Sequence, residues 1–133
     1  MSTDYTKIAT ADAPDFAAGR MEGVEARGLR DPAGAEQTGA MLHKLQPGVR
    51  QGFGHVHHEA EELFFVLSGS GRVNVGDEVV ELAERDLIRL APTTPRCFEA
   101  GDDGLEFLAF GPHLKGDGRI LPGWWGGDVP PED

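Results

Sequence analysis

The chain has 133 residues, a length that suits one domain with its own hydrophobic core. Its formal net charge of −11 repels phosphate backbones and anionic lipid surfaces, so neither nucleic acid nor a membrane is an expected partner. The single cysteine, Cys97, excludes a disulfide within the chain. The first residues lack a basic start followed by an apolar stretch, and a cytoplasmic protein is therefore expected.

Many short apolar runs, separated by 19 glycines and 9 prolines, predict a single all-β domain. Residues 1–36 are interpreted as an irregular arm with one short strand at 24–29, a candidate edge strand at a dimer interface. Residues 37–111 are expected to form the core of the domain, and residues 112–133 an irregular tail. The core strands are predicted at 38–45, 49–57, 62–67, 72–75, 78–82, 86–90, 96–100 and 105–110. This many short strands at regular spacing favour a β-sandwich or small barrel, and a jelly roll is the preferred choice.

One run of residues has the chemistry of a metal site: His55-Val56-His57-His58-Glu59-Ala60-Glu61-Glu62. Because side chains alternate faces along a strand, His55 and His57 point the same way, roughly 6.5 to 7 Å apart. Two such imidazoles can share one cation at metal to nitrogen distances of about 2.1 Å. Glu62 follows a tight bend and can return from the neighbouring strand as a third ligand. His58 lies on the other face of the strand and is expected to be solvated.

Residues 38–111 resemble the cupin superfamily, specifically its small single-domain members. The first motif of that family reads G, five residues, H-x-H, three or four residues, E, six residues, G. This chain matches the motif from His55 and His57 through Glu62 to Gly69, although six residues rather than five separate Gly48 from His55. The resemblance implies a jelly-roll β-barrel with a metal held by His55, His57 and Glu62.

The second motif of the family supplies a fourth ligand, a histidine, and this motif is eroded here. Alignment on Asp86 and the proline-rich turn that follows places Arg96 at the histidine position. A register shifted by one residue would place Cys97 there, but Phe98 would then no longer match the aromatic residue that usually follows the histidine. Arg96 is therefore favoured.

A guanidinium is permanently charged and cannot ligate a metal, so at most three protein ligands remain. Two interpretations stay open. In the first, a metal is held by three residues and Arg96 binds an anionic group of a substrate. In the second, the pocket is free of metal and Arg96 neutralises Glu62.

The mixed nitrogen and oxygen ligand set suits Fe(II), Mn(II), Ni(II) or Zn(II). The resemblance also implies a homodimer, formed by N-terminal strands that add to the partner's sheet. Whether the protein is an enzyme stays open. It is either a metal-dependent dioxygenase, isomerase or cyclase acting on a small organic substrate, or a module that binds or senses a small anionic ligand.

The candidate pocket holds one further histidine and several aromatic residues. His43 lies in an apolar strand near the site, where it either packs in the core or lines the cavity. Most aromatic residues are expected to pack in the core and some to wall a ligand cavity. The candidate pocket residues are Arg96, His43, Phe53, Phe64 and Phe98. Trp124 and Trp125, between glycines, are expected to cover the edge of the core or to pack on a partner subunit.

Overall fold

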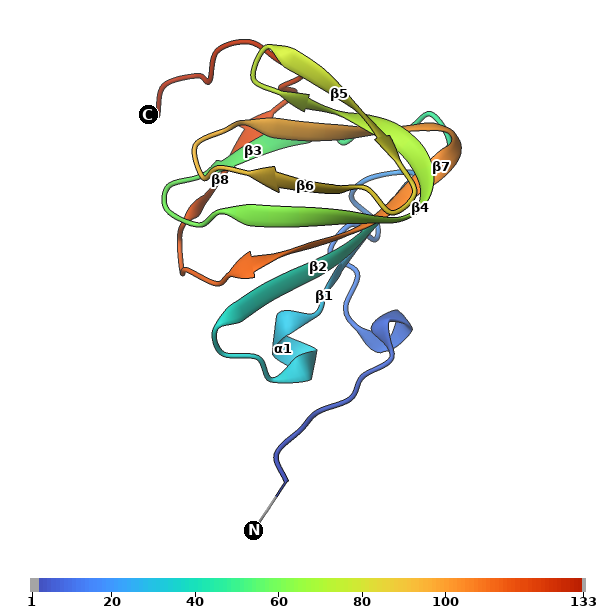
Figure 1. Cartoon of the computed structure of the whole chain (residues 1–133), viewed down its shortest axis with the longest axis vertical. Helices are drawn as coiled ribbons and strands as arrows, with labels where there is room; N and C mark the ends of the chain where they lie inside the picture. Colours follow the sequence, from blue (N-terminus) through green and yellow to red (C-terminus); the bar gives the residue numbers. More distant parts are fainter. Residues whose placement is uncertain (1–2, 133) are drawn as a thin grey trace.

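In the computed structural model, which describes residues 3–132, eight strands form one antiparallel sheet that curls into a half-barrel (Figure 1). The strands are β1 Val24–Gly28, β2 Thr38–Leu45, β3 Phe53–His57, β4 Glu62–Val75, β5 Glu78–Ala83, β6 Leu87–Leu90, β7 Arg96–Pro112 and β8 Gly118–Pro122. Helix is limited to the 3-10 turn η1 Thr10–Asp12 and the short α1 Arg30–Ala33. The predicted single all-β domain is confirmed. Within the described range, no helix is long and apolar enough to cross a membrane.

Strands β4 and β7 are each one long strand where the sequence predicted two short ones. The predicted strands at 62–67 and 72–75 are the two halves of β4, and those at 96–100 and 105–110 are the two halves of β7. The two long strands pair with each other along most of their length. The predicted strands at 72–75 and 78–82 pair with each other as a hairpin of β4 and β5.

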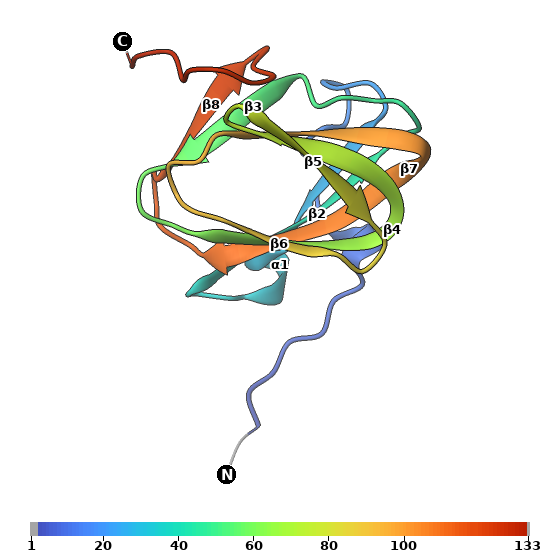
Figure 2. The ribbon, with the colours of Figure 1, turned by 45° about the horizontal axis from the view of Figure 1, so that its top comes forward.

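Glycines that were expected to end these strands bend them instead. The register between β4 and β7 shifts on both sides of Gly69, which adopts a left-handed φ of +80°. Such bulges increase the local twist of a strand, so a sheet that contains them can curl on itself. Figure 2 shows the result, with β3 and β8 facing β4 and β6 across the curl. The last glycine of the family motif therefore marks a bend in the barrel wall.

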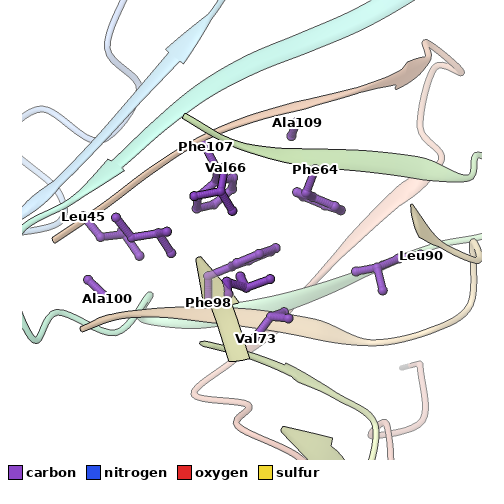
Figure 3. Packing of buried hydrophobic residues seen from close by; sticks show 11 residues of the cluster. Leu45, Phe64, Val66, Val73, Leu90, Phe98, Ala100, Phe107 and Ala109 are labelled. Carbon is purple, nitrogen blue, oxygen red and sulfur yellow. The ribbon is translucent and has the colours of Figure 1, made fainter. Parts of the chain in front are cut away.

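The hydrophobic core lies between the strands of the curled sheet (Figure 3). Three stacked or tilted rings lie at its centre, with Phe98 4.9 Å from Phe64 and 4.3 Å from Phe107 between ring centroids. The buried residues packed with them are Leu45, Val66, Val73, Leu82, Leu90, Ala100, Leu105 and Ala109. Burial of this apolar surface holds the two halves of β4 and β7 against each other.

The N-terminal arm contains the predicted strand, observed as β1, and then folds back along it. The Phe16 N–H donates to the Ala26 carbonyl at 2.8 Å, and the Gly28 N–H donates to the Pro14 carbonyl at 3.2 Å. Part of the outer edge of β1 is thus already paired within the chain. The homodimer stays a prediction.

The C-terminal tail is more regular than expected, because it contributes β8. This strand pairs with β3 over five residues, from Phe53 opposite Pro122 to His57 opposite Gly118. The short run Arg-Ile-Leu between a glycine and a proline carries too little periodicity to predict a strand. The pairing places the tail directly beside the two candidate histidines.

The bend at Gly69 predicts a large stability difference between two glycine substitutions. An added methyl at Gly69 would lie 2.1 Å from the Gly104 carbonyl oxygen, whereas Gly76, at a φ of +63°, has open space around it. Gly76→Ala should cost only the left-handed penalty of about 1–2 kcal/mol. Gly69→Ala should cost about 1–3 kcal/mol more, because backbone must move. Urea unfolding of both variants measures the difference, and equal costs would contradict this view of the bend.

Candidate metal centre

His55 and His57 lie on β3 and turn the same way, as expected for alternate residues of a strand. Their rings are 5.3 Å apart between centroids and nearly perpendicular, at 84°. Both side chains are mostly buried, with exposed fractions of 23% and 19%. Because β3 pairs with β8 on one side and meets β7 at Arg96 on the other, the backbone under both rings is fixed.

Glu62 begins β4, directly after the bend that follows β3. Its Oε1 lies 3.3 Å from Nε2 of His55 and 3.3 Å from Nε2 of His57. One ligand atom from each of the three residues can be chosen so that all lie within 4.8 Å of one another. The structure therefore brings together the three residues that the sequence nominated, in a cluster consistent with a metal site.

Arg96, at the start of β7, is fully buried behind this cluster. Its Nη1 donates to Glu62 Oε1 at 3.0 Å, and its Nη2 donates to the Ala91 carbonyl at 2.8 Å. The guanidinium thus pairs with Glu62, and Arg96 is not among the described residues that line the cavity. A direct contact between Arg96 and a ligand would require rearrangement of this pair.

The surroundings fix the charges of two members of the cluster. Burial disfavours ionisation of Glu62, but the contacts with His55 and His57 outweigh it, and the pKa of Glu62 lies well below its ordinary value. Burial lowers the pKa of His55 despite its hydrogen bond with Glu62. At neutral pH the site therefore presents an anionic carboxylate and a neutral His55 imidazole with a lone pair to offer.

Asp117 is a neighbour of the site that the sequence did not reveal. It lies just before β8, and its Oδ2 is 3.2 Å from Nδ1 of His57. The carboxylate also accepts backbone hydrogen bonds from Glu59 at 2.9 Å and Ala60 at 3.0 Å, within the bend that leads to Glu62. A lone aspartate in a glycine-rich tail gives no sequence signal for such a contact.

The cluster opens into a cavity of about 830 Å³. His43, Phe53 and Phe64 line this cavity together with the three clustered residues, whereas Phe98 is buried in the core and is not among the described lining residues. The apolar part of the wall comes from the arm and from several strands and loops: Pro14, Phe16, Met21, Val24, Ala26, Pro32, Ala40, Met41, Ala60, Ala109, Pro112, Leu114 and Ile120. Cavities of this size and character accommodate small organic molecules.

His43 is the polar group in the otherwise apolar β2 wall of the cavity. Its ring stacks on Phe107 at 4.7 Å between centroids, and its buried Nδ1 has no hydrogen-bond partner among the described residues. Burial, and next the proximity of His55, lower the pKa of His43 to about 4. The imidazole is therefore neutral at pH 7.

Cys97 and the two tryptophans pack in or against the hydrophobic core. Cys97 is fully buried, and burial raises the pKa of its thiol to about 11, which leaves almost no thiolate at neutral pH. Trp124 is buried with it in a second core cluster, and Trp125 packs against this cluster. The Arg50 guanidinium lies 3.9 Å from the centroid of the Trp125 ring. These residues close one edge of the core.

Residues 41–111 match the family model described as a cupin domain. The chain belongs to the cupin family. An uncharacterized protein of Methanocaldococcus jannaschii is 31% identical to this cupin over 70 residues, which is 50% of this chain and 56% of that protein. The match thus spans little more than half the length of this relative.

Solved structures share the fold of this cupin. A cupin protein from Bacteroides fragilis has a TM-score of 0.70 and 24% identity, covering 86% of this chain and 89% of that one. Oxalate decarboxylase from Bacillus subtilis has a TM-score of 0.73 and 22% identity, covering 91% of this chain and 33% of that one. A cupin-superfamily sugar phosphate isomerase from Silicibacter pomeroyi has a TM-score of 0.65 and 19% identity, with coverage of 84% and 83%. At these identities the likeness shows the fold alone.

The buried pair of Arg96 and Glu62 predicts a strong coupling between the two residues. Arg96→Met leaves a largely buried carboxylate without its cation and should cost about 3–5 kcal/mol of stability. Adding Glu62→Gln should recover part of that loss, because neither buried charge remains. Arg89→Met, which breaks an exposed pair with Glu61, should cost at most about 1 kcal/mol. Denaturant unfolding of Arg96→Met, Glu62→Gln, the double variant and Arg89→Met gives the four values, and additive costs for Arg96→Met and Glu62→Gln would contradict the coupling.

The low pKa of His43 predicts a loss of stability in acid. The folded protein keeps this ring neutral down to about pH 4, whereas the unfolded chain protonates it near its ordinary value of 6.5. The unfolded state therefore binds more protons between these values, and stability falls as the pH is lowered through this window. In metal-free protein, His43→Leu should reduce the loss of stability on acidification, whereas the substitution of the exposed His113 by Leu should not reduce it. Identical pH profiles of wild type and His43→Leu in denaturant unfolding would refute the assignment.

Proposed function

We propose that this cupin binds a divalent metal ion through His55, His57 and Glu62, and that the ion and the cavity together bind a small organic molecule. The observation that carries the proposal is the convergence of two imidazoles and one carboxylate in the wall of a mostly apolar cavity. Imidazole and carboxylate donors suit Fe(II), Mn(II), Ni(II) and Zn(II).

The residues present fit such an ion. His57 lies between two carboxylates, with Glu62 near Nε2 and Asp117 near Nδ1, yet neither buried ring nitrogen makes an aligned hydrogen bond with a described residue. A neutral imidazole carries one hydrogen, so one of its nitrogens faces a carboxylate with a lone pair. Either a second proton on the ring or a cation beside that nitrogen would relieve the repulsion. A metal ion beside Nε2 would satisfy that nitrogen and the carboxylate together.

The charges around the site favour an anionic ligand group. Arg96 already neutralises Glu62, so a divalent ion would keep net positive charge even after the contribution of Asp117. In a cavity with apolar walls such charge is weakly screened. An anionic oxygen donor with an apolar body would complete the charge balance and fill the cavity, although the chain as a whole is strongly acidic.

The reaction, if the protein is an enzyme, would use the ion as a Lewis acid or oxygen activator. The residues of the chain would have two roles beside that of the ion. The apolar walls would limit the access of water, and neutral His43 would orient a polar group of the ligand. Dioxygenase, isomerase and cyclase activities are all compatible with these roles. Fold neighbours that include a decarboxylase and an isomerase do not select among them.

A second candidate is a binding or sensing module for a small anion that needs no metal. The pair of Arg96 and Glu62 favours it, because this pair balances the carboxylate charge without an added cation. The two candidates differ in one measurable property. The first requires metal before the ligand binds, whereas the second binds its ligand equally well in a chelator.

Metal titration tests the first proposal. Untagged protein, stripped with a chelator and titrated with Mn(II), Ni(II) or Zn(II), should bind one equivalent, and His57→Ala should weaken binding by more than about 100-fold. The neighbouring His58→Ala is the matched control, because His58 is exposed on the other face of the chain, and it should leave affinity unchanged. His43→Ala should also have little effect.

Two outcomes of this titration would contradict the proposal. Less than about one tenth of an equivalent of each metal, after reconstitution, would remove the metal function and favour the second candidate. Equal losses in His57→Ala and His58→Ala would show that metal binds elsewhere.

A further inference from the structure

We propose that Asp117 is a positioning residue of the metal centre, which holds the hydrogen of His57 on Nδ1 so that Nε2 is free to bind the ion. This inference rests on the proposed metal function and assigns a role to the C-terminal tail. Asp117 lies outside the matched cupin region of residues 41–111.

The two ring nitrogens of His57 face different carboxylates, Asp117 at Nδ1 and Glu62 at Nε2. Asp117 Oδ2 lies 3.2 Å from Nδ1 of His57, and the Asp117 side chain is only 7% exposed. An ionised carboxylate accepts hydrogen bonds and donates none, so a lone pair on Nδ1 at this distance would be repelled. Glu62 acts in the same way on Nε2 as long as no cation lies between them. Once an ion lies there, Asp117 fixes the hydrogen on Nδ1, and the lone pair on Nε2 is free for the ion.

Asp117 itself is held in place by the bend that carries the site. Its Oδ1 accepts from the Glu59 N–H and its Oδ2 from the Ala60 N–H, while its carbonyl accepts from the His58 N–H at 3.1 Å. Three successive amides between His57 and Glu62 are thus tied to one residue of the tail.

Gly118, the residue after Asp117, also helps to fix the position of Asp117. Gly118 begins β8 and pairs with His57 on β3. Asp117 is therefore fixed relative to the ring through the strand that follows it as well as through the bend. A carboxylate anchored in this way can orient an imidazole without touching the ion, which is the arrangement that tunes metal-bound histidines in general.

Asp117→Asn is the sharpest test, because it keeps the size of the side chain. If the amide nitrogen takes the place of Oδ2, it opposes the Ala60 N–H, and it also donates a hydrogen toward Nδ1, which favours the imidazole hydrogen on Nε2 and blocks the metal. If the amide nitrogen faces the Glu59 N–H instead, two donors oppose each other and the bend is disturbed. Zn(II) affinity should fall about 10- to 100-fold in either case.

Asp15→Asn is the matched control. Asp15 also accepts two backbone hydrogen bonds, from Ala17 at 3.0 Å and Ala26 at 2.9 Å, but it is not among the described residues that line the cavity. Its replacement should lower thermal stability and leave Zn(II) affinity within about twofold of wild type, since no ligand is affected.

A nitrogen-15 NMR experiment on the Zn(II)-loaded proteins separates a positioning role from a structural one. Wild type should show a slowly exchanging hydrogen on Nδ1 of His57 and zinc on Nε2, and Asp117→Asn should lose that hydrogen signal. Zinc on Nδ1 in the wild type would overturn the inference, even if the variant failed to fold. Unchanged zinc affinity in Asp117→Asn would also overturn it, whereas a wild type that binds no metal would show that the proposed function itself is wrong.

Discussion

A single carboxylate oxygen, Oε1 of Glu62, contacts three residues on neighbouring strands of the sheet. It accepts a hydrogen bond from the fully buried Arg96 and contacts the Nε2 atoms of His55 and His57. The residues belong to β3, β4 and β7, so the contact ties the strands that surround the site. A buried guanidinium requires a charged partner, and its partner is the same carboxylate that belongs to the candidate metal site. The barrel and the site thus depend on one interaction.

The fold divides the interior of the curled sheet between packing and binding. The stacked rings of Phe98 and Phe107 pack in the core, and Phe64 both packs with them and lines the cavity. Apolar walls around the His and Glu cluster limit solvent screening, so each charge there has a larger effect than it would at the surface.

The cluster of His55, His57 and Glu62 could be predicted because its members are close along the chain. Alternation on β3 places His55 and His57 on one face, and a short bend brings Glu62 back to them. The bent strands β4 and β7 were divided in the prediction because glycine clusters resemble turns until the partner strand is known. The contact of Asp117 with His57 could not be predicted, because it depends on the pairing of β8 with β3. A strand of five residues carries too little sequence pattern to predict that pairing. The burial of Arg96 depends on tertiary packing in the same way.

The most direct test of this account is an anomalous-diffraction experiment on crystals soaked with Mn(II) or Zn(II), recorded above and below the absorption edge of the metal. The account predicts one strong peak between the side chains of His55, His57 and Glu62, with the pair of Arg96 and Glu62 intact behind it. No peak there in crystals whose solvent holds the metal in excess, or a peak elsewhere on the molecule alone, would contradict it.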